Sequence, residues 1–226
     1  MDNFSITRNG KPLRESKYTI DLENKIFASK ENNLVLGFRL LNGWTFNIDG
    51  NCCTFNTGHH CTFNTGGHCT FNTRHNCTFN TSNDCTFKAD YECTFDTGYG
   101  CTFNTEGRCI FYAYDRCIFH TAGYCKFKVG SFGTFKTGGY CTFKTGASCI
   151  FLTSEECTFN TCQNCIFKTR NGCTFETGEL CTFSISRVDS CKFKSYDGMS
   201  TILDREDKKH YLLTKEFIKI MKISND

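Results

Sequence analysis

An eight-residue period dominates the chain from Cys53 onward. The sequence reads CTFNTGHH, CTFNTGGH, CTFNTRHN and CTFNTSND in succession. Cysteine begins each unit from Cys53 to Cys181, except where Gly133 replaces it, and a last unit begins at Cys191 after a two-residue insertion. Self-similarity at a fixed short period is the sequence signature of a solenoid, so it constrains the fold more than any other feature.

Each unit has five patterned residues followed by three variable ones. We number these positions 1 to 8, so that Cys occupies position 1, Phe position 3 and Thr most often position 5. The patterned residues alternate as in a strand, which places positions 1, 3 and 5 on one face. A helix cannot keep this period on one face, because eight residues exceed two turns of 3.6 residues. Positions 6–8 are rich in Gly, Asn, Asp, His and Ser, which are typical turn residues.

The repeat therefore predicts an all-β fold, a parallel β-solenoid in which each unit is one strand and one turn. Two units, or 16 residues, per coil would place Phe opposite Phe and Cys opposite Thr, with coils about 4.8 Å apart. Three units, or 24 residues, per coil would form a triangular prism and remain the alternative. Where Gly133 replaces Cys, we expect Phe132 to tilt inward and fill the lost volume. The predicted core ladder contains Cys53, Phe55, Cys61, Phe63, Cys69, Phe71, Cys77, Phe79, Phe87, Phe95, Phe103, Phe111, Phe119, Phe127, Phe135, Phe143, Phe151, Phe159, Phe167, Phe175, Phe183 and Phe193.

The repeats divide the chain into three parts. We expect an N-terminal β cap at residues 1–43, the solenoid at 44–196 and a C-terminal cap at 197–226, since uncapped solenoid ends polymerise. Thr214 is a plausible N-cap of a short helix, although the residues after it also alternate as in a strand. The apolar face of this segment must be covered by the final coil or by a second copy of the chain in a homodimer. Its candidate interaction residues are Leu213, Phe217, Ile220 and Met221.

The charge balance and the N-terminal sequence restrict the classes of partner and the cellular compartment that we expect. The chain has 26 basic and 23 acidic residues. This balance makes nucleic acid an unlikely partner and gives no reason to expect a membrane surface. The N-terminus lacks a basic flank followed by an apolar run, so no secretory signal is predicted. The expected location is intracellular and reducing, and the 19 cysteines, an odd number, are expected to be thiols.

The cysteines and histidines do not form an obvious metal site. The repeated cysteines occupy inward positions, where a small buried thiol is a good packing residue. Cys162 and Cys165 form a single C-x-x-C pair, but one lies in a turn and the other faces inward. The histidines at 59, 60, 68, 75 and 120 are predicted to be solvated turn or outward residues. No metal, cofactor or small-molecule substrate is therefore predicted.

The outward positions give the chain its candidate functions. Early units carry Thr and Asn at positions 2 and 4, and later units carry Lys at position 4. Thr arrays allow an ice-binding protein as a minor alternative, although Asn ladders also simply stabilise stacking. We find no nucleophile with its base, no phosphate loop and no catalytic carboxylate pair, so no enzyme is predicted. The leading hypothesis is a structural or protein-interaction scaffold, and the alternative is a module that recognises a host protein or nucleic acid along one face.

The repeated C-T-F-N-T unit resembles that of the octapeptide-repeat proteins of large DNA viruses of amoebae, which are marseillevirus-like. The resemblance covers residues 53–195, and the tail Asp204–Lys215 also looks like tails that follow such repeats. The small-then-large inward pattern is similar to that of pentapeptide-repeat solenoids, although the period of eight departs from theirs. The resemblance implies a virus-encoded β-solenoid, located in host cytoplasm or in the virus particle, and carries no assigned function.

Overall fold

A computed structural model describes residues 4–38, 41–188, 190–194, 198–206 and 208–215. The chain divides into two compact units, Met1–Cys117 and Ile118–Asp226, and each is described by itself. Both units are parallel β-solenoids, so the predicted fold class is confirmed.

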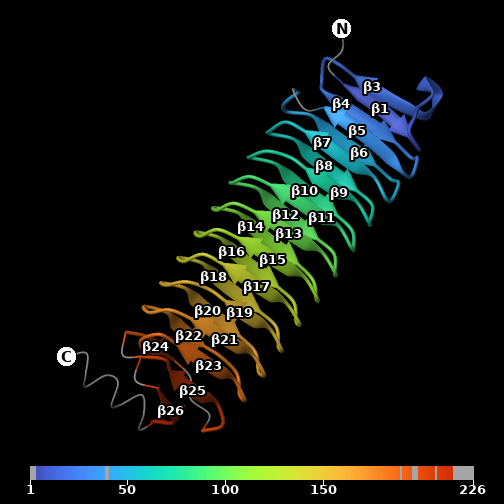
Figure 1. The fold of residues 1–226 in the computed structure, drawn as a ribbon. Coiled ribbons are helices and arrows are strands. Elements are labelled where there is room, and N and C mark those ends of the chain that lie inside the picture. The colour runs from blue at the N-terminus through green and yellow to red at the C-terminus, as the bar shows by residue number, and fades with distance from the viewer. Residues whose placement is uncertain (1–3, 39–40, 189, 195–197, 207, 216–226) are drawn as a thin grey trace. The chain divides into compact units, whose positions relative to one another are not determined.

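The first unit winds two sheets from short strands (Figure 1). One sheet has the order β2-β1-β5-β7-β9-β11-β13, and the other has the order β3-β4-β6-β8-β10-β12-β14. Their bounds are β1 Ser5–Arg8, β2 Lys11–Pro12, β3 Tyr18–Asp21, β4 Ile26–Ser29, β5 Leu34–Phe38, β6 Thr45–Ile48, β7 Thr54–Thr57, β8 Thr62–Thr65, β9 Thr70–Asn72, β10 Thr78–Thr81, β11 Thr86–Ala89, β12 Thr94–Thr97, β13 Thr102–Thr105 and β14 Ile110–Ala113, with a 3-10 turn η1 at Glu15–Lys17.

The second unit repeats this plan. One of its sheets has the order β15-β17-β19-β21-β23-β25-β26, and the other has the order β16-β18-β20-β22-β24. Their bounds are β15 Ile118–Thr121, β16 Lys126–Val129, β17 Thr134–Thr137, β18 Thr142–Thr145, β19 Ile150–Leu152, β20 Thr158–Thr161, β21 Ile166–Thr169, β22 Thr174–Glu176, β23 Thr182–Ile185, β24 Lys192–Phe193, β25 Thr201–Asp204 and β26 Lys209–Leu212.

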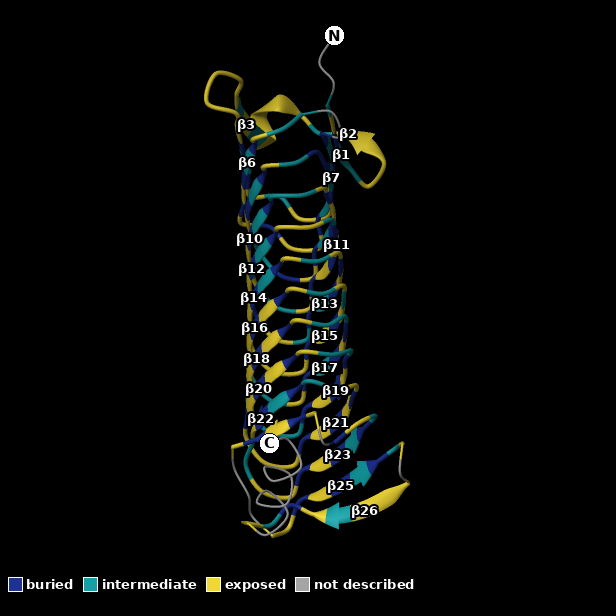
Figure 2. Ribbon diagram, turned by 90° about the vertical axis from the view of Figure 1, so that its left-hand side faces the viewer, coloured by how far each residue is buried: buried dark blue, intermediate teal, exposed yellow. Residues whose placement is uncertain are grey.

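The strand register settles the size of the coil. Phe55 pairs with Phe71 in one sheet and Phe63 pairs with Phe79 in the other, so each residue lies over the one 16 positions later. The two-unit coil is therefore confirmed, and the 24-residue prism is excluded. In Figure 2 the strands contain the deeply buried segments, while the joining loops are largely intermediate or exposed.

Phenylalanine fills the centre of each coil. Phe71 stacks on Phe87 of the next coil at 4.9 Å and 4°, and meets Phe79 of the facing sheet edge-on at 5.3 Å and 75°. The same two contacts recur in the second unit, where Phe143 stacks on Phe159 at 4.9 Å and meets Phe151 edge-on at 5.2 Å. Offset stacks and edge-to-face pairs are the arrangements that the quadrupole of the ring favours, so both ladders add to the free energy of burial.

Cysteine at position 1 packs beside the turn and also satisfies its carbonyls. The Cys77 thiol donates to the carbonyls of His75 at 3.6 Å and Gly58 at 3.7 Å. Cys157 does the same with Glu155 at 3.5 Å and Gly138 at 3.7 Å. The His75 carbonyl already accepts from the backbone N–H of His60 and the Glu155 carbonyl from that of Tyr140, so the thiol adds a second, weaker donor to carbonyls that are already paired.

Position 133 departs from the repeat for a steric reason. A Cβ atom on Gly133 would lie 2.8 Å from Cε2 of Phe135, so the ring of its own unit occupies the space of the missing side chain. The expectation that Phe132 tilts inward is wrong, because its side chain is 57% exposed. Phe132 occupies position 8, which has φ of 58° there and directs the side chain into solvent.

The parallel ladders extend into both predicted caps. In the first unit, β4 pairs in parallel with β6, and the antiparallel strand β3 follows it at the edge. In the second unit, β25 pairs in parallel with β23, and β26 closes the sheet in antiparallel orientation with mostly exposed residues (Figure 2). Leu213 is only 1% exposed, so it packs inside this end. The predicted residues Phe217, Ile220 and Met221 lie outside the described residues.

Candidate functional sites on the outer faces

The repeats direct their chemistry outward. The inward Cys and Phe of the predicted core ladder are all buried, from 0% to 9% exposed. The accessible surface of each unit therefore consists of the outward positions 2 and 4 and the turns at positions 6–8. These surfaces differ between the two units.

Asparagine ladders run along both outer faces of the first unit, before Lys88 and Asp96 take the same position 4 in the coils that follow. Asn80 donates from Nδ2 to Oδ1 of Asn64 at 2.8 Å, and Asn64 donates in turn to Asn47 at 2.8 Å. Asn72 donates to Asn56 at 3.2 Å on the other sheet. These amides form hydrogen bonds with one another, so the asparagine ladder stabilises the stacking of successive coils.

The two outer faces of the second unit carry exposed apolar and basic residues. Ile118, Ile150, Leu152 and Ile166 occupy outward positions of β15, β19 and β21 and are 39–49% exposed. On the opposite sheet, Lys128 lies directly over Lys144 in the register. Like charges that lie directly opposite each other destabilise a sheet. The stacked lysines therefore lower the stability of their sheet, whereas the neutral asparagine pairs of the first unit do not.

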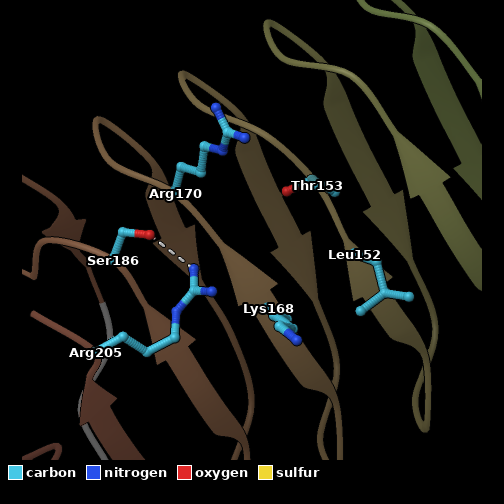
Figure 3. Close-up of a pocket in the computed structure, with 6 residues that line it drawn as sticks. All are labelled: Leu152, Thr153, Lys168, Arg170, Ser186 and Arg205. Carbon is cyan, nitrogen blue, oxygen red and sulfur yellow. Dashed lines mark hydrogen bonds between the residues drawn. The ribbon is translucent and has the colours of Figure 1, made fainter. Parts of the chain in front are cut away.

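A basic groove opens beside the apolar face. It has a volume of about 280 Å³ and is lined by Leu152, Thr153, Lys168, Arg170, Ser186 and Arg205 (Figure 3). We call it the basic groove, since three of its lining residues are cations and none is acidic. In Figure 3 Arg205 reaches toward Ser186, while the guanidinium of Arg170 points away from Arg205 and Lys168.

Arg205 is held in place within the basic groove. Its Nη2 donates to Oγ of Ser186 at 2.8 Å and to the carbonyl of Thr169. Its Nε is buried without a hydrogen-bond partner, as is Oγ1 of Thr153. The carboxylate of the neighbouring Asp204 accepts from the backbone N–H groups of Val188 and Glu206. The guanidinium is therefore fixed by neutral acceptors, and its charge is not neutralised by them.

The other two cations of the groove are equally uncompensated. Lys168, Arg170 and Arg205 form no ion pair with any residue in the described ranges. Guanidinium and ammonium groups are the side chains that bind phosphates and carboxylates through charge-assisted hydrogen bonds, and the groove offers them beside the hydroxyl group of Ser186. Sequence reasoning missed this groove because Arg205 lies outside the repeat, although Lys168 and Arg170 occupy positions 4 and 6 of one unit.

Three histidines gather on one turn of the first unit. His59 and His75 occupy position 7 of two stacked coils, and their rings stack at 4.6 Å. His60 meets them edge-on at 5.1 Å and 5.9 Å. The pKa of His59 lies below its usual value because the ring is desolvated and faces His75, His60 and Arg74. The separation of 16 residues between His59 and His75 is the sequence signal that would have brought them together.

The remaining sequence expectations concern cysteine. Cys162 is exposed and Cys165 is buried, so the C-x-x-C pair points in two directions. The pKa of the Cys101 thiol is raised to about 11, first by its hydrogen bond with Cys117 and also by burial. A thiol with a raised pKa stays protonated at neutral pH, which suits a packing role.

Comparisons with known proteins do not assign a family. No family model matches the chain, and neither the curated proteins nor the solved structures contain a match. The resemblance to octapeptide-repeat proteins therefore stays a prediction that depends on the repeat unit. No helix in the described part of the chain is long and apolar enough to cross a membrane.

Proposed function

We propose that this protein is a non-enzymatic interaction scaffold whose second unit binds an acidic protein segment. The observation that carries the proposal is the basic groove, which Lys168, Arg170 and Arg205 line with no acidic lining residue. The solenoid supplies a rigid support, because every coil fixes the next through backbone ladders and stacked rings. In the setting that the resemblance implies, the scaffold would serve a virus-encoded assembly.

The neighbouring face favours a protein over a free anion. Leu152 lines the groove, and Ile150 and Ile166 lie on the same sheet with 39% and 49% of their side chains exposed. A segment that alternates acidic and apolar residues would place carboxylates or phosphates on the cations and apolar side chains on the isoleucines. Burying that apolar area would contribute about 25 cal/mol per Å².

Charge balance supports the same assignment. Residues 1–117 contain 11 basic and 12 acidic residues, whereas residues 118–226 contain 15 and 11. This modest excess would speed association with an acidic partner and would make binding dependent on salt. Duplex DNA offers a uniform line of phosphates but no apolar side chains, so it fits the mixed face less well.

The test uses Arg170→Asp and a matched control. Binding of a short labelled peptide that combines glutamate with leucine would be followed by fluorescence anisotropy. Arg170→Asp reverses one charge in the groove and should weaken binding by about tenfold or more, or roughly 1.4 kcal/mol. Arg108→Asp makes the same charge change in the first unit, where Arg108 lies 3.5 Å from Glu92, and should leave the peptide affinity within about twofold.

Two outcomes would overturn the proposal. One is a peptide affinity that Arg170→Asp and Arg108→Asp change equally, since the groove would then contribute only to the overall charge. The other is duplex DNA of equal charge that binds more tightly than the peptide and is equally sensitive to Arg170→Asp. That result would make the groove a nucleic-acid site.

A further inference from the structure

The histidine cluster of the first unit has the composition of a transition-metal site. His59, His60 and His75 each offer a ring nitrogen, and these atoms lie within 4.8 Å of one another. Imidazole nitrogen is a preferred ligand of Zn²⁺, Cu²⁺ and Ni²⁺. Three ligands that leave further positions to water are enough to hold Zn²⁺.

The solenoid backbone holds the three histidines together. The backbone N–H of His60 donates to the carbonyl of His75 at 3.2 Å, which joins the two turns directly. The backbone N–H of His59 donates to Oδ1 of Asn42 at 3.1 Å. His60 has φ of 58°, a left-handed conformation that turns its side chain away from the direction of its neighbours along the strand. The cluster is thus set by coil register and does not depend on a flexible loop.

One ring nitrogen of the cluster is free of a hydrogen bond that a metal would have to replace. Nδ1 of His59 is buried and has no hydrogen-bond partner among the described residues. A metal binds neutral imidazole through such a lone pair. Binding would also remove the cost of this unpaired buried nitrogen.

A modest rearrangement separates this geometry from coordination. Zn–N bonds of about 2.0–2.1 Å place tetrahedral ligand nitrogens roughly 3.4 Å apart, so the atoms must approach by about 1.4 Å. The parallel rings of His59 and His75 must also rotate about their Cβ–Cγ bonds, since their lone pairs lie in stacked planes. His60 is exposed and the other two rings are half-buried, which leaves room for these rotations.

Two neighbours limit the affinity for a cation. Arg74 precedes His75 and opposes the cation electrostatically, so binding is weaker than in an acidic surrounding. Tyr91 stacks on His75 at 5.0 Å and must let that ring rotate before it can coordinate. We propose that His59, His60 and His75 bind one late first-row divalent cation, such as Zn²⁺ or Ni²⁺, at this turn.

The experiment measures binding of Zn²⁺ alone, and of Ni²⁺ alone, by titration calorimetry in a phosphine reductant. All variants carry Cys52→Ser and Cys162→Ser, which remove the two exposed thiols. His60→Asn and His75→Asn are the test variants, because Asn76 and Asn83 occupy positions 8 and 7 elsewhere in the repeat. His68→Asn is the matched control, since His68 also occupies position 8 but lies 4.0 Å from Asp84 and outside the cluster.

The parent is the chain that carries only Cys52→Ser and Cys162→Ser. The proposal expects one equivalent of metal to bind to this parent and to His68→Asn in the same background. His60→Asn and His75→Asn should each bind at least about tenfold more weakly. Absence of a one-equivalent site on the parent would overturn the proposal. So would an affinity that is unchanged in both test variants or reduced as much by His68→Asn. Circular dichroism that matches the parent would show that the variants are folded.

Discussion

Equivalent grooves occur beside Thr73 in the first unit and beside Thr153 in the second, and their backbones follow the same path. In each, a strand ends one residue early, and the threonine N–H donates to the carbonyl of the lysine in the next coil, Lys88 at 2.9 Å or Lys168 at 3.0 Å. The threonine Oγ1 is buried without a hydrogen-bond partner in both. The grooves therefore share a framework that the repeat imposes.

The charged residues that line the two grooves differ, and at one equivalent position the sign of the charge is reversed. Position 6 of the next coil is Asp90 in the first groove, which is otherwise lined by Arg74 and Lys88 among neutral residues. The same position is Arg170 in the basic groove, where Arg205 adds a third cation. An acidic residue lines the first groove, whereas none of the residues that line the second is acidic. The comparison shows that the inward residues fix a framework that both units share, whereas a few outward residues set the charge of each groove.

The largest effect on stability should follow the removal of one core phenylalanine ring from each unit. Phe79→Ala and Phe143→Ala should each cost about 3–5 kcal/mol, since both rings are fully buried between stacked and edge-on neighbours. Urea unfolding followed by circular dichroism would measure the free energies. Phe132→Ala is the control and should change stability by less than about 0.5 kcal/mol, because that ring is exposed. A much smaller cost in one unit would show that the two cores are not equivalent.

A smaller effect is expected where the repeat departs from its consensus. Gly133→Cys restores the usual residue but places a Cβ atom 2.8 Å from the Phe135 ring. Displacing that ring should destabilise the chain by about 1–3 kcal/mol. A gain in the free energy of unfolding would show instead that the ring moves aside freely and that the consensus residue fits.

The smallest effects should appear on the outer faces, with opposite signs in the two units. Asn80→Thr breaks an amide ladder in the first unit and should cost about 0.5 kcal/mol. Lys144→Asn removes a stacked like charge in the second unit and should stabilise it by about 0.5 kcal/mol. Thermal unfolding of the two variants at low salt gives the comparison. Equal signs would contradict the different electrostatics of the two faces.

The fold was readable from the sequence because the repeat encodes it many times. Phe at every position 3 and small residues around it predict both the inward face and the coil, and the pairing of Phe55 with Phe71 confirms the 16-residue choice. The exception at Gly133 was not readable, since which ring occupies the space depends on packing in three dimensions.

The candidate sites were less accessible to sequence reasoning. The basic groove joins residues of the repeat to Arg205, and no period relates them. The histidine cluster follows from the coil register, yet it appears only when residues 16 positions apart are considered together. Leu213 was predicted as an interaction residue, but its apolar side chain is buried within its own unit. The homodimer stays a prediction.

The most direct test of the account exchanges the two equivalent residues whose charge is reversed between the grooves, Asp90 and Arg170. A chain carrying both Asp90→Arg and Arg170→Asp keeps its net charge and its core. The acidic peptide, fitted with a photo-crosslinker, would be mapped on this chain and on the parent by mass spectrometry. The account predicts that crosslinks move from residues 118–226 in the parent to residues 1–117 in the exchanged chain. Crosslinks that stay in residues 118–226 would contradict it.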